Sequence, residues 1–138
     1  MPQSDKPCRV AIVDDHPEIR RLLSMMLRFE PGIELVGEAT NGLEAVDLAR
    51  RLLPDALLLD IAMPVMDGLE ALPQILAISP DTTVLMLSAF SSDQFRSEAE
   101  RLGASGYVEK GSAMMQIAAT LRTACAARST PAEEGTLT

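Results

Sequence analysis

The sequence predicts an α/β fold built on a five-stranded parallel sheet, because strand-like and helix-like segments alternate five times along its 138 residues. The clearest strand is the apolar run 56–59, whose side chains are apolar on both faces, as expected inside a parallel sheet. This run ends at Asp60, and three other apolar runs also end in polar residues. Right-handed crossovers then place helices on both faces, and we expect the flavodoxin-like strand order 2-1-3-4-5.

The first half of the chain predicts two strands and two helices before the run that ends at Asp60. Residues 10–13 form the first strand, and Pro17 suits the first turn of the helix that follows. That helix carries an apolar stripe at positions 19, 22, 23, 26 and 27, and it stops at Pro31 and Gly32. Residues 33–38 alternate weakly, which indicates an edge strand. Asn41 opens the second helix, whose inward positions are 45, 46, 49 and 52.

The second half repeats the pattern after a loop at residues 63–68. The third helix has apolar residues at 72, 75 and 76, with Pro73 inside the pattern, where it either falls near the helix start or bends the helix. Residues 84–87 and 107–108 read as strands, and residues 93–102 and 114–125 read as helices. We therefore expect an N-terminal extension at 1–8, one domain at 9–127 and a flexible C-terminal tail at 128–138.

Composition excludes several classes of protein. The hydrophobic content of 47% predicts a globular chain, and the net charge of -8 argues against direct nucleic-acid binding, which needs clustered lysines and arginines. No stretch has the length and apolarity of a membrane span or a signal peptide, so we expect a cytoplasmic protein that does not bind membranes. Cys8 and Cys125 lie far apart in the sequence and form no ligand motif, so we expect free thiols in a reducing compartment.

The polar residues that end the strands predict the functional site. Asp14, Asp15, Asp60, Ser88 and Lys110 should meet at the carboxyl edge of the sheet, where open α/β sheets bind ligands. Carboxylates this close repel one another unless a cation lies among them, and Mg²⁺ prefers carboxylate and phosphate oxygens. Lys110 could pair with a carboxylate and then hold a phosphoryl oxygen, while Ser88 could donate to the same group.

The turn after the first strand, residues 14–18, argues against a flavin or dinucleotide site. Such sites surround phosphate with backbone N–H groups, whereas this turn is acidic and Pro17 removes one N–H. His16 is the only histidine of the chain. No cysteine or second histidine supports it as a metal ligand, so we expect it to cap or turn the chain beside the acidic pair, from where it could influence access.

Four motifs together resemble the receiver domain of response regulators in two-component signalling. They are Val-Asp-Asp-His-Pro at 13–17, Asp-Ile-Ala-Met-Pro-Val-Met-Asp-Gly at 60–68, Leu-Ser-Ala at 87–89 and Gly-Ala-Ser-Gly-Tyr-Val-Glu-Lys-Gly at 103–111. The resemblance extends over residues 9–127 and is greatest to the NarL/FixJ type, whose members usually carry a C-terminal helix-turn-helix. This chain ends at Thr138 without room for one, so a role in transcription would require a DNA-binding domain that follows in a longer protein.

The resemblance implies a phosphorylation-activated switch. Asp60 would accept a phosphoryl group from a histidine kinase or a phosphotransfer protein, and Lys110 and Ser88 would bind the phosphoryl oxygens. Ser88 would then move toward this group, and Tyr107 would turn into the space that Ser88 leaves. A homodimer is one possible output of the change.

The resemblance also implies the ligands of a Mg²⁺ ion. These are the carboxylates of Asp15 and Asp60 and the backbone carbonyl of Ala62, with Asp14 acting mostly through water. Two alternatives stay open: a receiver-like module that binds partners without phosphorylation, and a small Mg²⁺-dependent phosphatase of the haloacid dehalogenase kind. The latter needs a second acid two residues after its nucleophile, where this chain has Ala62. We therefore expect no enzymatic activity beyond self-catalysed phosphotransfer and dephosphorylation.

Overall fold

The computed structural model describes residues 6–89, 92–112 and 114–127. Its five strands pair in parallel in the order β2-β1-β3-β4-β5, which confirms the predicted fold and strand order. The elements in chain order are β1 (Cys8–Val13), α1 (Pro17–Arg28), β2 (Ile33–Ala39), α2 (Gly42–Leu52), β3 (Ala56–Asp60), α3 (Gly68–Ile78), β4 (Thr83–Ser88), α4 (Asp93–Arg101), β5 (Gly106–Glu109) and α5 (Met114–Ala127).

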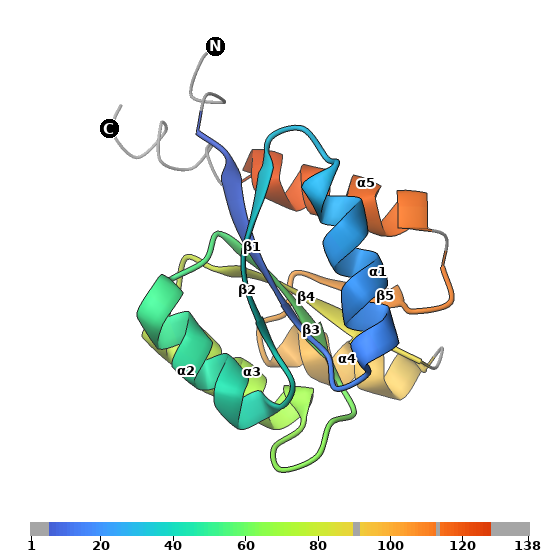
Figure 1. Cartoon of the computed structure of the whole chain (residues 1–138). Helices are drawn as coiled ribbons and strands as arrows, with labels where there is room; N and C mark the ends of the chain where they lie inside the picture. The colour runs from blue at the N-terminus through green and yellow to red at the C-terminus, as the bar shows by residue number, and fades with distance from the viewer. Residues whose placement is uncertain (1–5, 90–91, 113, 128–138) are drawn as a thin grey trace.

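Helices cover both faces of the sheet, and each face has its own apolar core. Figure 1 shows α1 and α5 on one side, with α2, α3 and α4 on the other. One core joins alternate strand residues to α2, α3 and α4, and the second joins the remaining strand residues to α1 and α5. Every residue of β3 is buried, as expected for a strand covered on both faces, whereas β2 is only partly buried because it lies at the edge.

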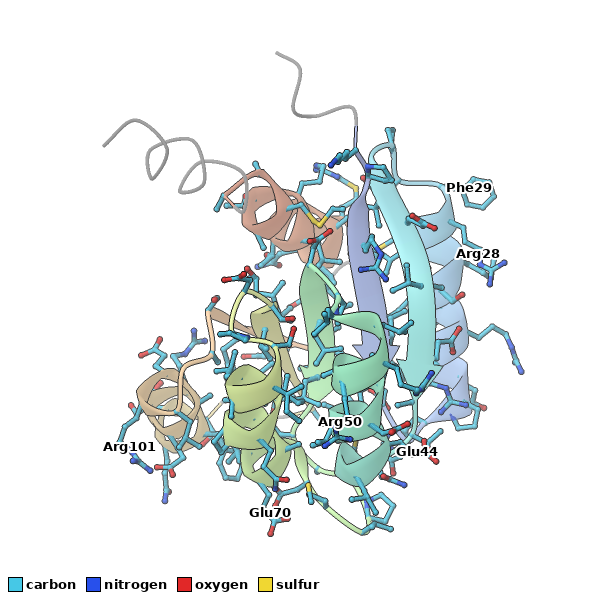
Figure 2. All side chains as sticks on the ribbon, turned by 90° about the vertical axis from the view of Figure 1, so that its left-hand side faces the viewer. Arg28, Phe29, Glu44, Arg50, Glu70 and Arg101 are labelled. Carbon is cyan, nitrogen blue, oxygen red and sulfur yellow. A yellow bond between two sulfur atoms is a disulfide. The ribbon has the colours of Figure 1, made fainter. Side chains whose placement is uncertain are left out.

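The apolar stripes of the helices are confirmed in their centres and overestimated at their margins. Leu23 and Leu27 of α1 are buried, but Leu22 is 50% exposed because the predicted stripe is wider than the contact with the sheet. Phe29, just after α1, is 85% exposed and points into solvent in Figure 2. α3 begins at Gly68 and continues through Pro73, which is exposed and faces away from the core.

The loop between β3 and α3 is held tightly against the end of β3. Asp67 and Glu70 form a reciprocal capping box that starts α3. The N–H of Gly68 donates to the carbonyl of Ile61 at 2.7 Å. A Cβ atom at Gly68 would collide with the backbone carbonyl of Asp60, so only glycine permits this close approach. The loop therefore fixes the backbone that carries Asp60.

The prediction of free thiols is wrong, because Cys8 and Cys125 form a disulfide whose Cα atoms lie 5.8 Å apart. Cys8 starts β1 and Cys125 lies in the last turn of α5, and both contribute to the same apolar core. α5 packs on the same face of the sheet as α1. The two cysteines are therefore in contact although they lie 117 residues apart in the sequence. The yellow bond in Figure 2 joins β1 and α5.

None of the helices in the described ranges is long and apolar enough to cross a membrane.

Candidate functional site

The register of β1 and β3 brings two of the predicted acids together. Val13 lies opposite Leu59, so the next residues, Asp14 and Asp60, stand side by side at the carboxyl edge of the sheet. Asp14 is fully buried and Asp60 is 2% exposed. The Asp14 N–H continues the ladder by donating to a carbonyl at the end of β2. The backbone thus holds two carboxylates out of water at neighbouring positions.

Lys110 bridges these two carboxylates from the end of β5. Its ammonium nitrogen lies 2.7 Å from Asp14 Oδ2 and 3.0 Å from Asp60 Oδ2, and its side chain is only 10% exposed. The Lys110 N–H donates to the carbonyl of Ser88 at 2.7 Å, which ties the ends of β4 and β5 together. Ser88 is 2% exposed. The predicted pairing of Lys110 with a carboxylate is confirmed, and it involves two carboxylates.

Asp15 and His16 complete the cluster from the turn before α1. The His16 N–H donates to Asp14 Oδ1 at 2.8 Å, a local bond that closes the turn. The His16 Nδ1 atom lies 3.1 Å from Asp14 Oδ1 and 3.2 Å from Asp15 Oδ1. The expected turn role of His16 is therefore confirmed, but its side chain makes no capping bond to α1. Sequence reasoning missed that the imidazole faces both acids.

Arg20 is a second residue that the sequence reasoning missed. It lies in the first turn of α1, where its Nη1 donates to the backbone carbonyl of Asp14 at 2.8 Å. Its Nε also lies 3.5 Å from Glu38 Oε1 at the end of β2. An arginine one helical turn after the acidic pair is the only sequence signal for this role. Arg20 therefore anchors the turn that carries the acids.

The donor set fits a divalent cation. One ligand atom from each of Asp14, Asp15, His16 and Asp60 lies within 4.8 Å of the others. Apart from their contacts with the Lys110 ammonium and His16 Nδ1, one buried oxygen of each carboxylate has no hydrogen-bond partner within the described ranges. Three carboxylates and the Lys110 ammonium leave two negative charges, which a dication would neutralise. Hard oxygen donors of this kind suit Mg²⁺.

Burial and charge perturb the two central groups in opposite ways. Burial raises the pKa of Asp60 to about 6, and the charge of Asp14 adds to the rise, while the Lys110 ammonium opposes it. Burial alone would lower the pKa of Lys110, but its pairing with Asp14 and Asp60 outweighs burial and raises that pKa. At neutral pH the lysine is charged and Asp60 is mostly ionised, so Asp60 presents a nucleophilic carboxylate.

The remaining predicted residues lie around this cluster. Ala62 follows Asp60 by two positions and is exposed. Tyr107 lies in β5 and is half-buried, and the guanidinium carbon of Arg96, from α4, lies 4.8 Å from the centre of its ring. Both residues line a cavity of about 480 Å³ between α4, β5 and α5. The structure therefore brings Asp14, Asp60 and Lys110 into ion-pair contact and places Asp15 within 4.8 Å of both acids, with Tyr107 on the adjoining face.

Comparison with known proteins agrees with this geometry. Residues 10–122 match the family model described as the response regulator receiver domain. The response regulator GacA of Pseudomonas viridiflava is 36% identical over 114 residues, which are 83% of this chain and 53% of GacA. A protein-glutamate methylesterase/protein-glutamine glutaminase of Alkalilimnicola ehrlichii is 44% identical over 104 residues, which are 74% of this chain and 26% of that enzyme.

A solved structure of the signal receiver domain of the response regulator NarL from Mycobacterium tuberculosis has the same fold. It matches with a TM-score of 0.80 and 34% sequence identity, over 86% of this chain and 97% of that chain. The chain spans about half the length of GacA, at 53%, and about a quarter of the methylesterase, at 26%. The family match extends over most of the described elements, from β1 to α5. This chain therefore belongs to the response regulator receiver domain family.

Proposed function

We propose that the chain is a phosphorylation-activated signalling switch that accepts a phosphoryl group on Asp60. The observation that carries this proposal is the pairing of the buried Asp60 carboxylate with the Lys110 ammonium at 3.0 Å, inside a cluster with an excess of negative charge. A buried carboxylate needs a cation beside it, and the same cation can receive the charge of a phosphoryl group.

In the proposed reaction, an Asp60 carboxylate oxygen attacks the phosphorus atom of the donor. An O–P bond forms on Asp60 while the P–N bond of a phosphohistidine, or the P–O bond of a small phosphodonor, breaks and its electron pair leaves with the donor. Lys110 and Ser88 bind the phosphoryl oxygens and hold the group in line. Water later cleaves the acyl phosphate, which restores the Asp60 carboxylate and resets the switch.

The proposed metal ligands are Asp15, Asp60 and the carbonyl of Ala62, with Asp14 acting mostly through water. Bound Mg²⁺ would supply charge neutralisation and orientation of the phosphoryl oxygens. The excess of negative charge that Lys110 leaves on the three clustered acids supports this assignment. The role of the protein is then to keep the acids fixed and partly dry, so that the ion and Lys110 act without rearrangement.

Ser88 and Tyr107 form the proposed switch. Ser88 moves toward the phosphoryl group and Tyr107 turns inward, which alters the surface formed by α4, β5 and α5. The Arg96 guanidinium lies over the Tyr107 ring at 4.8 Å, and this cation–π contact would favour the present orientation of the ring. The backbone bond from Lys110 to Ser88 supports mechanical coupling between the two strands involved.

We further propose that this domain occupies residues 9–127 in a cytoplasmic protein whose phosphodonor is a histidine kinase or a phosphotransfer protein. Homodimerisation is a proposed output, as is control of transcription where a DNA-binding domain follows in a longer chain. We propose that this acidic domain does not contact nucleic acid directly and does not turn over an external substrate. The tail at 128–138 lies outside the described residues.

The test is labelling with acetyl phosphate in the presence of Mg²⁺. The wild-type chain should gain one acid-stable, base-labile phosphoryl group in an intact-mass measurement, and Asp60→Asn should gain none. Asp81→Asn is the matched control, because Asp81 is an exposed aspartate in the turn before β4. Failure of the wild type to be labelled, or labelling of Asp60→Asn, would overturn the proposal. Steady hydrolysis of a phosphate monoester would instead favour a phosphatase.

A further inference from the structure

His16 lies closer to the acidic cluster than a turn residue needs to be. Its Nδ1 atom is 3.1 Å from Asp14 Oδ1, 3.2 Å from Asp15 Oδ1 and 3.5 Å from the Lys110 ammonium. It also lies within 4.8 Å of the carboxylate oxygen that Asp60 offers to the cluster. The ring therefore directs a nitrogen atom toward the same space as the three carboxylates.

The turn itself does not require this imidazole. The bond that closes the turn comes from the backbone N–H of His16, and the following Pro17 restricts the backbone at the start of α1. The His16 side chain makes no capping bond, and it is 60% exposed. The ring is therefore not needed to close the turn, and its exposure leaves room for it to reorient toward an ion.

We propose that His16 is a nitrogen ligand of the metal site and that the site consequently binds Zn²⁺ more tightly than Mg²⁺. Three carboxylate oxygens and one imidazole nitrogen make four donors, the number and the types that zinc accepts in tetrahedral sites. Imidazole is a good ligand for zinc, whereas Mg²⁺ prefers oxygen donors alone. The inference rests on the metal site of the proposed function, but it does not depend on phosphoryl transfer.

The charges of the site support binding of a dication by this set. Asp14 and Asp60 share the Lys110 ammonium, while Asp15 Oδ1 lies 3.2 Å from His16 Nδ1. An ion bound by the acids would lie beside the His16 ring, because a ring nitrogen is within 4.8 Å of the oxygen that each acid offers. No cysteine thiol competes for zinc, because the only two cysteines of the chain form the disulfide.

The test is direct titration of the oxidised, untagged protein with Zn²⁺ and Mg²⁺ at pH 7.5, with a competing chelator for Zn²⁺. His16→Asn should lower Zn²⁺ affinity by at least about tenfold, as loss of a metal-site interaction typically does. It should change Mg²⁺ affinity by less than about twofold, since Mg²⁺ gains little from imidazole. Glu18→Gln is the matched control, because it removes an exposed carboxylate near the site that is outside the cluster.

A second measurement observes the imidazole itself. His16 is the only histidine, so the imidazole signals in a ¹H–¹⁵N spectrum of the untagged chain belong to it alone. Zn²⁺ should shift the Nδ1 resonance strongly, and Mg²⁺ should leave it nearly unchanged. An Nδ1 signal unmoved by Zn²⁺, or a His16→Asn variant that loses no zinc affinity or loses both ions equally, would overturn the inference.

The two proposals fail separately in this design. Zinc binding that depends on His16 supports the inference even where acetyl phosphate does not label Asp60, and in that case only the proposed phosphorylation fails. Conversely, Asp60 could be labelled in a Mg²⁺-dependent reaction while His16→Asn keeps the wild-type affinity for Zn²⁺. That result overturns the inference and leaves the proposed function intact.

Discussion

Replacing the proposed phosphoacceptor should stabilise the metal-free protein. Asp60 is 2% exposed, and burial together with the charge of Asp14 raises its pKa from 3.8 to about 6. The folded state therefore disfavours the ionised form by about 3 kcal/mol, since one pKa unit corresponds to about 1.4 kcal/mol. Asparagine has nearly the shape of the protonated acid and carries no charge at any pH. Asp60→Asn should remove this cost and leave Lys110 paired with Asp14.

The pH dependence follows from the direction of the shift. An acid whose pKa is higher in the folded state costs nothing while it is protonated in both states, below about pH 3. The cost grows as pH rises from the unfolded to the folded pKa, and it is constant above the latter. The advantage of Asp60→Asn should thus be about 3 kcal/mol at pH 7.5 and about half of that at pH 5.

Urea denaturation measures this difference in stability. Far-ultraviolet circular dichroism is the suitable probe, because a chain with no tryptophan and one tyrosine gives little intrinsic fluorescence. With chelator present, the Asp60→Asn midpoint at pH 7.5 should exceed the wild-type midpoint by about 1 M or more, given typical slopes of about 1–3 kcal/mol per molar. Asp81→Asn should show no comparable gain. An Asp60→Asn variant no more stable than the wild type, or equally stabilised at pH 5 and 7.5, would refute the electrostatic reasoning.

Three further predictions concern the supports of the site. Lys110→Met should lower the free energy of unfolding by about 3–5 kcal/mol, because it leaves two buried carboxylates without their cation, and urea midpoints at pH 7.5 test this. Gly68→Ala should cost at least about 2 kcal/mol and reduce labelling by acetyl phosphate, whereas Gly111→Ala, with open space around its Cβ, should do neither. Reducing the disulfide should cost up to about 5 kcal/mol, because it closes a long loop. The urea midpoint of a Cys8→Ala/Cys125→Ala variant should not change when reductant is added. An equal shift of the midpoint in the wild type and in this variant would contradict the prediction.

The fold was predictable because local patterns and global topology agree. The run 56–59 has no polar side chain, which is typical of an internal strand, and the structure confirms a strand that is fully buried. The site was predictable for a related reason. In a parallel sheet all strands end at the same edge, so Asp60 and Lys110 are in contact although they lie 50 residues apart in the sequence. The strand order therefore places residues from the ends of different strands in one cluster.

The features that the sequence did not reveal depend on contacts rather than on pattern. Nothing in the spacing of Cys8 and Cys125 indicates that β1 and the last turn of α5 share one core. The need for glycine at position 68 arises from the backbone carbonyl of Asp60, a residue eight positions earlier in the chain. The direction of the His16 ring depends on the backbone of one turn. Each is set by three-dimensional proximity that periodicity does not encode.

The backbone hydrogen bond from Lys110 to Ser88 suggests how phosphorylation of Asp60 would affect the surface near Tyr107. Lys110 is held by its side chain to Asp14 and Asp60 and by its N–H to the Ser88 carbonyl. A phosphoryl group on Asp60 would offer new oxygens to both Lys110 and Ser88, while Asp14 keeps its ion pair. Because Ser88 and Lys110 lie at the ends of the neighbouring strands β4 and β5, one charge change at Asp60 would act on both strands. Tyr107 lies three positions before Lys110 and lines the cavity between α4, β5 and α5, so we expect a displacement at the end of β5 to reach this surface.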